Sequence, residues 1–501
     1  MGLRGNTLVV VLLALLIACA VGACGDGAST DGSAPDPASW PAPNGDAANH
    51  RRATSSIDAA SVDDLGVAWR LPLAAIYAAT PIVLDGVVYA QDLLSNVYAI
   101  DLASGRLRWR HDYDEADTGP NGVTVVDGRV FGATASRAFA LDAETGRELW
   151  STTLAHHPGD LIDMAPGYAD ETVYVSTAVA GVGAVGTLWA LDADTGKRRW
   201  RWRQVPEDLW GHPEVNSGGG LWHPPAFDED GALYVSTGNP LPFPGADRWA
   251  WGSSRPGANR WTNSIAKLDA DSGRVLWARQ VLPHDIYDWD LEGPVILDRV
   301  DGRPLAITAG KMGVVYAFDA EDGQLRWRRP VGLHNGHDDD NLLALRGRAP
   351  FSQPTKVLPG WWGGIETQMA SDGETVYAPV NDLATVYDSG TRLTPPDPAD
   401  GTGRMVALDI ASGRLRWDRR LPRSPYGAAT ISNDLVFTTT YDGTVWALAR
   451  ADGAVVWRTR LDGGGTNAPV VVAGDTLIAA MSVPLQGQQP QLVAYRLDAG
   501  R

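Results

Sequence analysis

The sequence predicts an all-β fold assembled from one repeated unit, and three observations support this prediction. First, seven segments combine an apolar strand, a Gly and a Trp four residues beyond that Gly, as in VYAIDLASGRLRW. They end at Trp109, Trp150, Trp200, Trp277, Trp327, Trp417 and Trp457. Second, Trp69 in LGVAWRLPL has the same strand context but lacks a hairpin partner upstream. Third, QLVAYRLDAGR supplies such a partner strand at the other end, where the sequence stops at Arg501 before any Trp strand.

Each unit is predicted to be a β-hairpin whose second strand carries the Trp. Alternating residues such as Val97 and Ala99 suit a strand, and the Asp-x-x-x-Gly that precedes most of the Trp positions suits a tight turn with a positive φ. Self-similarity at a period of roughly 40 to 50 residues is typical of architectures whose units bury their faces against their neighbours. We therefore expect each Trp to lie near the outer edge of one blade and to pack over the next.

Joining the two terminal half-units gives one blade made from both ends of the chain, which closes a ring and removes its open edges. The predicted fold is therefore an eight-bladed β-propeller with tryptophan-docking repeats, its ring closed by the N- and C-terminal strands. The intervals Trp200–Trp277 and Trp327–Trp417 are longer than one repeat. Each is expected to hold an additional blade plus insertions, unless it is a single blade with a large insertion, so the blade count ranges from seven to nine. Such long insertions are usually functional loops.

The composition indicates a large, well-hydrated domain. The 501 residues include 56 Gly, 33 Pro and 20 Trp, and 44% are hydrophobic, which is enough for the core of one large propeller. The net charge of −18 disfavours nucleic acid and anionic lipid as partners, because both repel an acidic surface. The two cysteines lie near the N-terminus, so the folded domain is expected to have no disulfide, and no C-x-x-C-H is present to attach haem.

The N-terminus is predicted to be a targeting segment. Arg4 precedes an apolar run that is too short for an ordinary membrane-spanning helix, and VGAC has the small-residue pattern of a bacterial lipoprotein cleavage site ending at Cys24. Cys19 is a second candidate for lipidation, and a plain secretory signal is the alternative. The predicted division is a lipoprotein signal peptide at 1–24, a flexible tether at 25–38 and the propeller at 39–501. The protein would then be an exported cell-envelope lipoprotein, held on the outer side of the membrane only by its lipid anchor.

Two stretches in the middle of the chain have residues suited to ligand binding. In GGGLW, Gly219 and Gly220 allow a close backbone approach and Trp222 can lie flat against a planar ring, although a core Trp is the simpler alternative. In STGNPLP, the side-chain carbonyl of Asn239 is a hard oxygen ligand suited to calcium or a lanthanide, and an Asn that holds a turn is equally compatible.

The stretch HDIYDWDL has the densest group of ionisable residues. His284, Asp285, Asp288 and Asp290 lie within seven residues, and Asp288 and Asp290 face the same side if the chain is extended. The alternative to a functional site is a solvated acidic loop.

The chain resembles the quinoprotein alcohol and sugar dehydrogenases, which are eight-bladed propellers that bind pyrroloquinoline quinone (PQQ). The resemblance runs from about Trp40 to the C-terminus. It rests on the Trp repeat together with GGGLW, YVSTGNPLP, LPHDIYDWDL and GKMGVVYAFD, in the order that the family has them.

The resemblance implies a role for each matching residue. Trp222 is expected to form the floor under the quinone, with Gly219 and Gly220 beside it, and Asn239 is expected to contact the metal. Asp288 is expected to be the general base beside the metal, and Asp290 an additional ligand associated with lanthanides. Lys311 matches the basic residue that hydrogen-bonds the quinone oxygens, the alternative being an exposed Lys at a strand end.

The sequence departs from the family pattern at several positions. It has no cysteine for the vicinal pair that the family places on the other face of the quinone. No acidic residue lies between Glu171 and Asp192, where the family has a metal-binding Glu. Ala78 and Asn121 stand where the family usually has a Glu and an Arg.

Acidic residues elsewhere are candidate replacements for the missing ligands. Glu366 in GGIETQMA is the first candidate for the metal. The run HNGHDDD, with His334, His337 and Asp338 to Asp340, could add to it, or it is a solvated loop.

These observations favour an extracytoplasmic quinoprotein-type oxidoreductase that oxidises an alcohol or sugar hydroxyl with PQQ and passes electrons to a separate acceptor. A calcium or lanthanide ion would be the second cofactor. The alternative is a non-enzymatic propeller of the cell envelope, a scaffold or ligand-binding lipoprotein. A third possibility is an altered pocket that binds another metal or small ligand through Glu366 and the histidines.

Overall fold

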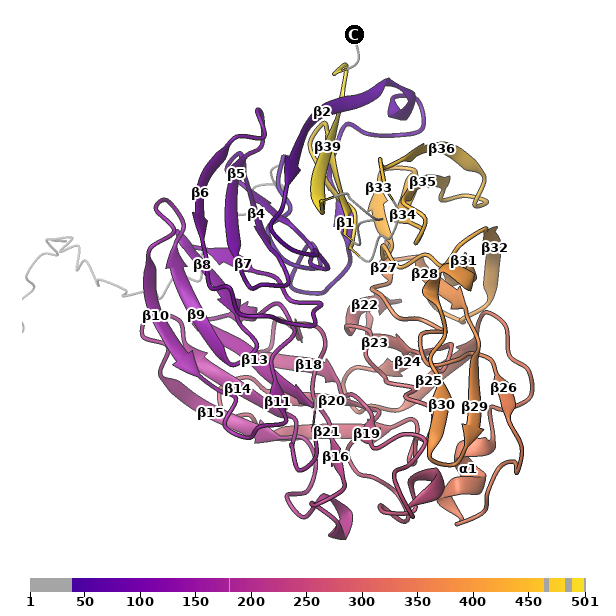
Figure 1. Ribbon diagram of the computed structural model, residues 1–501. Helices are drawn as coiled ribbons and strands as arrows, with labels where there is room; N and C mark the ends of the chain where they lie inside the picture. Colours follow the sequence, from indigo (N-terminus) through magenta and orange to yellow (C-terminus); the bar gives the residue numbers. More distant parts are fainter. Residues whose placement is uncertain (1–37, 180, 464–467, 483–488, 500–501) are drawn as a thin grey trace, which may run out of the picture. The chain divides into compact units, whose positions relative to one another are not determined.

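The chain folds into four-stranded antiparallel sheets that follow one another in sequence order (Figure 1). The computed structural model describes residues 38–179, 181–463, 468–482 and 489–499. The first four sheets are β3(Ile82–Leu84)–β4(Val87–Gln91)–β5(Val97–Asp101)–β6(Leu107–His111), β7(Thr124–Val126)–β8(Arg129–Ala133)–β9(Arg137–Asp142)–β10(Glu148–Thr153), β12(Gly167–Ala169)–β13(Thr172–Val179)–β14(Thr187–Asp192)–β15(Arg198–Arg203) and β17(Ala226–Phe227)–β18(Ala232–Ser236)–β20(Ser264–Asp269)–β21(Val275–Gln280). The next four are β22(Ile296–Val300)–β23(Arg303–Gly310)–β24(Val314–Asp319)–β25(Leu325–Pro330), β27(Ala370–Ser371)–β28(Thr375–Asp382)–β31(Thr402–Asp409)–β32(Leu415–Leu421), β33(Thr430–Ser432)–β34(Leu435–Thr439)–β35(Thr444–Ala449)–β36(Val455–Arg460) and β37(Val471–Ala473)–β38(Thr476–Met481)–β39(Gln491–Leu497)–β2(Leu65–Pro72).

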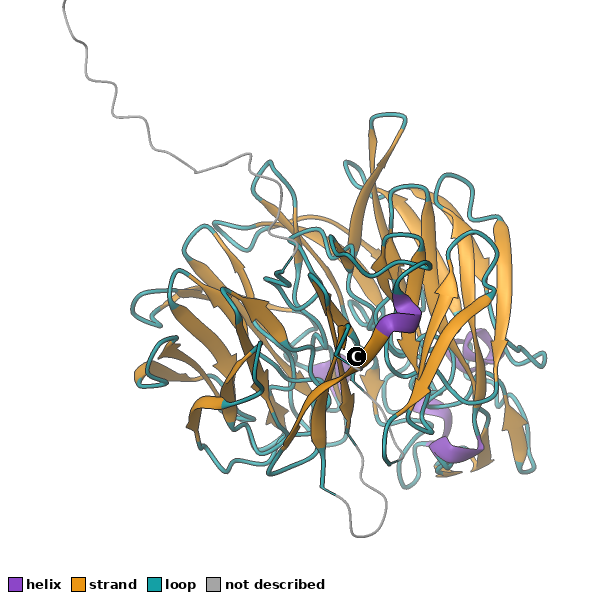
Figure 2. Cartoon of the chain, turned by 90° about the horizontal axis from the view of Figure 1, so that it is seen from above, coloured by secondary structure: helices purple, strands orange, loops and turns teal. Residues whose placement is uncertain are grey.

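Helical structure is confined to short pieces (Figure 2). Within the described residues, the one α-helix is α1(Asp340–Leu345), and the other helical segments are single 3-10 turns. Two short strands extend the sheets: β1(Arg52–Ala53) pairs in parallel with β33, and β11(Asp160–Leu161) pairs with β13. None of the described helices is long and apolar enough to span a bilayer. The predicted all-β, propeller-like fold is confirmed. The proposed signal peptide, Cys24 and nearly all of the tether lie outside the described residues.

The two ends of the described chain meet in one sheet. Strand β2 pairs antiparallel with β39, with Trp69 opposite Ala494 and Pro72 opposite Gln491 (Figure 1). Side chains of both strands enter a core cluster that also contains Val471 and Ile478. The sequence-based pairing of LGVAWRLPL with QLVAYRLDAGR is therefore present, although no sheet of the structure is itself closed.

Each repeat Trp lies on the last strand of its sheet and packs on the turn of the next sheet. Seven indole Nε1 atoms donate to a backbone carbonyl at 2.8–3.2 Å. The acceptors are the carbonyls of Leu102 for Trp69, Ala143 for Trp109, Ala193 for Trp150, Ala270 for Trp200, Ala320 for Trp277, Ile410 for Trp327 and Arg450 for Trp417. The predicted packing of each Trp over the next blade is therefore observed for these seven.

The repeat Gly is required by both its conformation and its contact with the Trp. At Gly196, φ is +66° and an added Cβ would lie 2.5 Å from the ring of Trp150. The turn is held by the Asp four residues earlier. In the first repeat, Asp101 accepts hydrogen bonds from the backbone N–H and the hydroxyl of Ser104, and its carbonyl accepts from the N–H of Gly105. The fixed Gly-to-Trp spacing is thus the signature of a seam between neighbouring sheets.

The two long intervals contain insertions rather than additional blades, so the expectation of an additional blade in each is wrong for the described residues. Between Trp200 and Trp277, the added elements are β16(Ser217–Gly218) and β19(Pro240–Leu241), which pair with each other. Between Trp327 and Trp417, they are α1 and a three-stranded sheet, β26(Thr355–Val357)–β29(Thr385–Ser389)–β30(Arg392–Thr394). The larger distance between successive Trp positions in these intervals therefore reflects inserted residues and not a blade that has lost its Trp.

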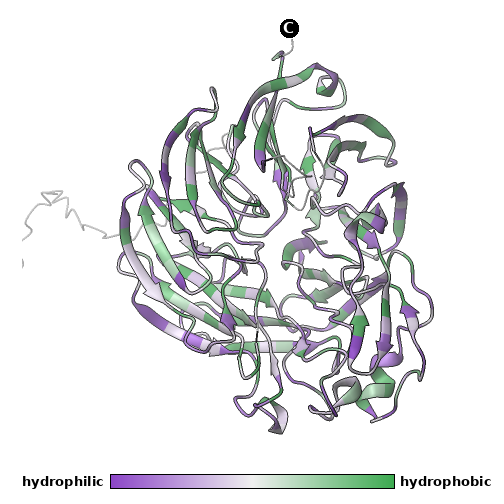
Figure 3. Ribbon diagram, viewed as in Figure 1, coloured by the Kyte–Doolittle hydropathy of each residue, from purple (hydrophilic) through white to green (hydrophobic). Residues whose placement is uncertain are grey.

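The core lies between the sheets and along their middle strands. Strand β4 is buried at all five positions, whereas the last strand β6 alternates exposed and half-buried residues. Hydrophilic residues accordingly mark last strands such as β15 and β32 (Figure 3). This arrangement leaves the loops that connect successive strands free to carry the candidate site.

Candidate functional site

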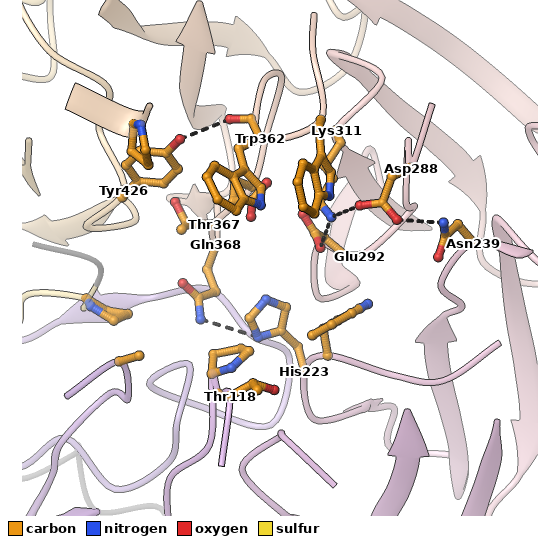
Figure 4. A pocket seen from close by; sticks show the side chains of 18 of the residues that line it. Thr118, His223, Asn239, Asp288, Glu292, Lys311, Trp362, Thr367, Gln368 and Tyr426 are labelled. Atoms are coloured by element: carbon orange, nitrogen blue, oxygen red, sulfur yellow. Dashed lines mark hydrogen bonds and ion pairs between the residues drawn. The ribbon is translucent and has the colours of Figure 1, made fainter. Parts of the chain in front are cut away.

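A cavity of about 640 Å³ collects most of the residues that the sequence singled out (Figure 4). Its lining includes Ala78, Thr118, Pro120, Trp222, His223, Asn239, Phe243, Asp288, Glu292, Lys311, Trp361, Trp362, Glu366, Gln368, Tyr426 and Tyr441. These residues lie in loops that connect the strands, including both long insertions. Positions far apart in the sequence thus converge on one concave site, as is usual for small-molecule binding.

The acidic stretch after β21 folds so that Asp288 and Asp290 face Lys311. The carboxylate of Asp285 accepts the backbone N–H groups of Tyr287 and Trp289 at 2.8 and 2.7 Å, and Asp288 takes a left-handed φ of +62°. This local loop brings Asp288 and Asp290 to 2.8 Å each from Lys311 Nζ. Asp288 and Asp290 thus converge on one ammonium through a loop with a left-handed residue, and not through the extended chain on which their common side was expected.

Asn239 orients both carboxylates from the opposite side. Its Nδ2 donates to Asp288 Oδ1 at 2.6 Å, and its backbone N–H donates to Asp290 Oδ1 at 2.7 Å. Because β18 ends at Ser236 and β19 begins at Pro240, Asn239 sits in the short connection that enters the first insertion. Asp290 is 1% exposed and lies behind the lining rather than in it.

Glu292 is a site residue that the sequence analysis missed. It lines the cavity, is 6% exposed, and its Oε2 lies 3.7 Å from Lys311 Nζ. The available signal was the alternation Asp288-x-Asp290-x-Glu292, which continues the spacing already recognised for the first two carboxylates. Glu366, the predicted replacement ligand, also lines the cavity.

The cluster has more carboxylates than cations. Burial raises the pKa of Asp288 more than the nearby ammonium of Lys311 lowers it, and burial also raises the pKa of Glu292 and of Glu366. Burial alone would lower the pKa of Lys311, but the surrounding carboxylates outweigh it and raise that pKa well above its ordinary value. Because buried carboxylates outnumber the single ammonium, an additional cation would stabilise their ionised forms.

The carboxylates of Asp288, Asp290 and Glu292 are arranged around the ammonium of Lys311. No group of three or more His, Cys, Asp or Glu side chains in the described part of the chain already has the arrangement of a metal centre. Glu292 Oε1 and Glu366 Oε2 are nevertheless buried without any hydrogen-bond donor from the described residues. Both side chains line the cavity, and each has one oxygen atom that accepts no hydrogen bond from the described residues.

Trp222 lines the cavity, and the glycines before it pack the backbone. Gly219 and Gly220 have φ of +84° and +108°, and a Cβ on Gly220 would lie 2.6 Å from the Cα of Ala178. The backbone N–H of Gly219 donates to the carbonyl of Asn239 at 3.2 Å, which ties the two predicted stretches together. The glycines are not part of the lining, so a direct contact with a cofactor stays a prediction for them.

The insertions add an aromatic wall that the sequence did not identify. Trp361 and Trp362 stack with their ring centroids 4.7 Å apart, and Phe243 lies 5.7 Å from Trp361. The hydroxyl of Tyr426 donates to the carbonyl of Trp362 at 3.1 Å. The neighbouring His223 is buried and its pKa is lowered to about 3, chiefly by burial and further by the charge of Arg51, so it is neutral at pH 7.

The histidine-rich run does not enter the cavity. His334 Nδ1 lies 2.6 Å from Asp338 Oδ1, and His337 Nδ1 lies 2.7 Å from Asp340 Oδ2. Each histidine therefore has a carboxylate partner within its own run, and neither histidine lines the cavity. The suggestion that these histidines join Glu366 in one pocket is therefore not supported by the structure.

Comparison with known proteins connects this geometry to a family. The family model described as glucose/ethanol/alcohol dehydrogenase, β-propeller domain, matches residues 40–124 and 162–328. A second model, outer membrane protein assembly factor BamB, matches residues 93–220 and 363–501. Of these two models, only the first covers the segment that contains Asp288, Asp290 and Lys311.

Full-length relatives and solved structures agree with the first model. The quinohemoprotein alcohol dehydrogenase of Comamonas testosteroni is 29% identical over 501 residues, covering 86% of this chain and 70% of that protein. The crystal structure of the quinohemoprotein alcohol dehydrogenase from the same organism matches with a TM-score of 0.79 at 25% identity, over 92% of this chain and 81% of that one. A europium-containing methanol dehydrogenase shares the fold, with a TM-score of 0.76 at 20% identity over 92% of this chain and 99% of that one.

The dehydrogenase model covers half of the sequence, and its match includes Trp222, Asn239 and the acidic cluster around Lys311. The chain therefore belongs to the family of glucose, ethanol and alcohol dehydrogenase β-propeller domains, as a divergent member of the PQQ-dependent dehydrogenases.

Proposed function

We propose that this protein oxidises the hydroxyl group of an alcohol with PQQ and a hard metal ion. The observation that carries the proposal is Asp288, a 6% exposed carboxylate on the cavity wall, held on one oxygen by Asn239 and on the other by Lys311. A buried, fixed carboxylate with a raised pKa is suited to accept a proton from a substrate hydroxyl. The alcohol dehydrogenase relatives support the reaction class.

The residues present fit a hard cation. Calcium and the lanthanides prefer carboxylate and amide oxygens, and the cavity offers Asn239, Asp288 and Glu366, with Asp290 directly behind. The uncommitted oxygen of Glu366 has no other evident purpose in the fold. An added cation would also offset the excess of carboxylates around Lys311.

The residues also fit a flat ring, with one condition. Trp222 and the stacked pair Trp361–Trp362 offer aromatic surface, and Lys311 can donate to a quinone oxygen. PQQ is also a tricarboxylate, and Lys311 is the one Lys or Arg among the described residues that line the cavity. We therefore expect quinone binding to depend strictly on the metal, which supplies the second positive charge.

The protein's own residues would act as follows. When bound, the quinone supplies a two-electron acceptor and the metal a Lewis acid. Asp288 accepts the hydroxyl proton, while Asn239 and Lys311 fix the direction of its carboxylate. The aromatic wall excludes water from the reacting carbon.

Several finer expectations belong to the same proposal. We propose an eight-bladed ring that is closed by β2 and β39 and spans residues 39–501, and the order of the sheets supports this count. A sugar hydroxyl is a second possible substrate, and electrons would leave through a separate acceptor, because the sequence has no haem-attachment motif. Export as a lipoprotein anchored at Cys24, after a signal peptide at 1–24 and a tether at 25–38, is proposed from the sequence alone.

The test is calorimetric titration of the purified protein with PQQ, with calcium or lanthanum chloride and with EDTA. We expect binding only when metal is present. Asp288→Asn should lower alcohol-dependent dye reduction about 100- to 10,000-fold, the usual range for loss of a general base. Asp127→Asn, an exposed carboxylate elsewhere in the fold, serves as the matched control and should change nothing. No binding under any metal condition would contradict the proposal and favour an envelope scaffold, to be pursued through its protein partners.

A further inference from the structure

Three carboxylates from one short segment surround Lys311. Asp288, Asp290 and Glu292 alternate along the chain after β21, and Lys311 Nζ lies 2.8, 2.8 and 3.7 Å from them. Figure 4 shows Asp288 and Glu292 beside Lys311. All four side chains are less than 10% exposed. Glu292 is the member of this group that neither the sequence motif nor the proposed general base accounts for.

The three carboxylates differ in how far their oxygens are already used. Asp290 accepts from Lys311 on one oxygen and from the N–H of Asn239 on the other. Asp288 likewise accepts one hydrogen bond on each oxygen. Glu292 Oε2 lies beyond hydrogen-bond distance from Lys311, and Glu292 Oε1 has no donor from the described residues.

A buried carboxylate with no hydrogen bond is unfavourable for the fold by itself. An unsatisfied buried polar group destabilises a fold, and more so when it is charged, whereas an apolar residue would pack there without that cost. Glu292 also lines the cavity, so its side chain borders space that a ligand can occupy, and its buried Oε1 lacks a donor from the described residues. The unused oxygen therefore indicates a bound cation rather than a structural role.

We propose that Glu292 is a direct ligand of the metal ion and binds it through Oε1, beside Asp288 and Asn239. Lys311 acts as the fixed counter-ion that holds Asp288 and Asp290 in place, which leaves Glu292 as the carboxylate of this segment free to turn to the metal. This inference rests on the proposed function, because it assigns a ligand to the metal of that same site.

The experiment titrates the purified protein with terbium(III) chloride and records luminescence excited through Trp. Trp222 is positioned as the energy donor, since its ring centroid lies 5.9 Å from Lys311 Nζ. Luminescence lifetimes in H₂O and D₂O count the water molecules bound to terbium. Neither readout requires the quinone or turnover.

For Glu292→Gln we expect terbium binding about 100-fold weaker than for wild type, because the amide keeps an oxygen atom but loses the negative charge. For Glu292→Ala, which has no ligand atom, we expect in addition about one more bound water. The control Asp117→Asn removes a buried carboxylate next to the cavity residue Thr118 but outside the Lys311 cluster. It should leave the water count unchanged, because a remote charge alters affinity without changing the ligands.

The possible outcomes separate the two proposals. Equal affinity in wild type and Glu292→Gln, with equal hydration in wild type and Glu292→Ala, would overturn the assignment of Glu292 while leaving the metal site intact. Absence of terbium binding in the wild type would overturn both the assignment and the metal-dependent function. If Glu292→Gln fails to fold by circular dichroism, Glu292→Asp replaces it, and its shortened carboxylate should likewise weaken binding and admit water.

Discussion

Replacement of Lys311 by Met tests the electrostatic description of the site most directly. Lys311 Nζ makes 2.8 Å contacts with both Asp288 and Asp290 and faces Glu292 at 3.7 Å, in surroundings that are almost fully buried. Removing one partner of a buried ion pair costs about 3–5 kcal/mol, because the remaining charge has no compensation. We expect a loss of that size in the free energy of unfolding of the metal-free protein at pH 8.

The loss should shrink at low pH. Burial already raises the pKa of Asp288, and removal of the ammonium, which lowers that pKa, raises it further. A carboxyl group with a raised folded-state pKa contributes stability that is fully present below its unfolded pKa, about 4, and is lost as the pH rises through the folded value. Near pH 4 the carboxyl group of Asp288 is protonated and no longer needs Lys311.

Urea denaturation followed by circular dichroism, in EDTA at pH 4 and at pH 8, measures the two differences. Lys267→Met is the matched control, because Lys267 contacts a single carboxylate, that of Asp228 at 3.1 Å, in a less buried position. Its loss should be smaller. An equal loss for Lys311→Met at both pH values would refute the reasoning, since it would show that packing and not charge makes Lys311 important.

Three further predictions concern the seam and the acidic cluster. Gly196→Ala should destabilise by at least about 1 kcal/mol more than Gly128→Ala, because both have positive φ but only Gly196 has Trp150 where the methyl group would go; thermal midpoints compare them. Trp150→Phe should cost about 1 kcal/mol or more in the same assay through the lost hydrogen bond to the Ala193 carbonyl, and an unchanged midpoint would contradict a sealing role. Glu366→Gln should make the metal-free protein more resistant to urea at pH 8 than the wild type, with no gain at pH 4, because burial raises the pKa of this carboxyl group and its ionised form opposes folding.

The fold was predictable because the contact between neighbouring sheets depends on residues that lie close together in the sequence. Each repeat Gly has a positive φ and is followed four residues later by a Trp, and at seven positions the structure packs this Gly against the Trp of the preceding sheet. The long intervals were misjudged because the spacing between two Trp positions gives length but not pairing. Strands β16 and β19, for example, pair with each other instead of starting a new four-stranded sheet.

The site was predictable only where its residues lie close together in the sequence. Asp288 and Asp290 are separated by one residue, and the same spacing extended by two residues would have found Glu292. What brings the first two to Lys311 is a loop with a left-handed φ at Asp288 and not a strand. Trp361 and Trp362 belong to an insertion whose path depends on the whole fold, and no local pattern connects them to the cavity. His334 was a plausible metal ligand from the composition of its run. In the structure its Nδ1 lies at hydrogen-bond distance from the carboxylate of Asp338, four residues later.

The pairing of β2 with β39 also bears on the order in which the protein can be completed. Strand β2 emerges early during synthesis, but its partner lies near the end of the described chain, with Pro72 opposite Gln491. The hydrogen-bonding edge and the apolar residues of β2 therefore stay exposed until β39 has been synthesised. Local hairpins assemble quickly, whereas such a distant contact forms slowly. The β2–β39 pairing joins one of the first strands made to the last, so we expect a chain that stalls before residue 491 to keep an unpaired strand edge that promotes aggregation.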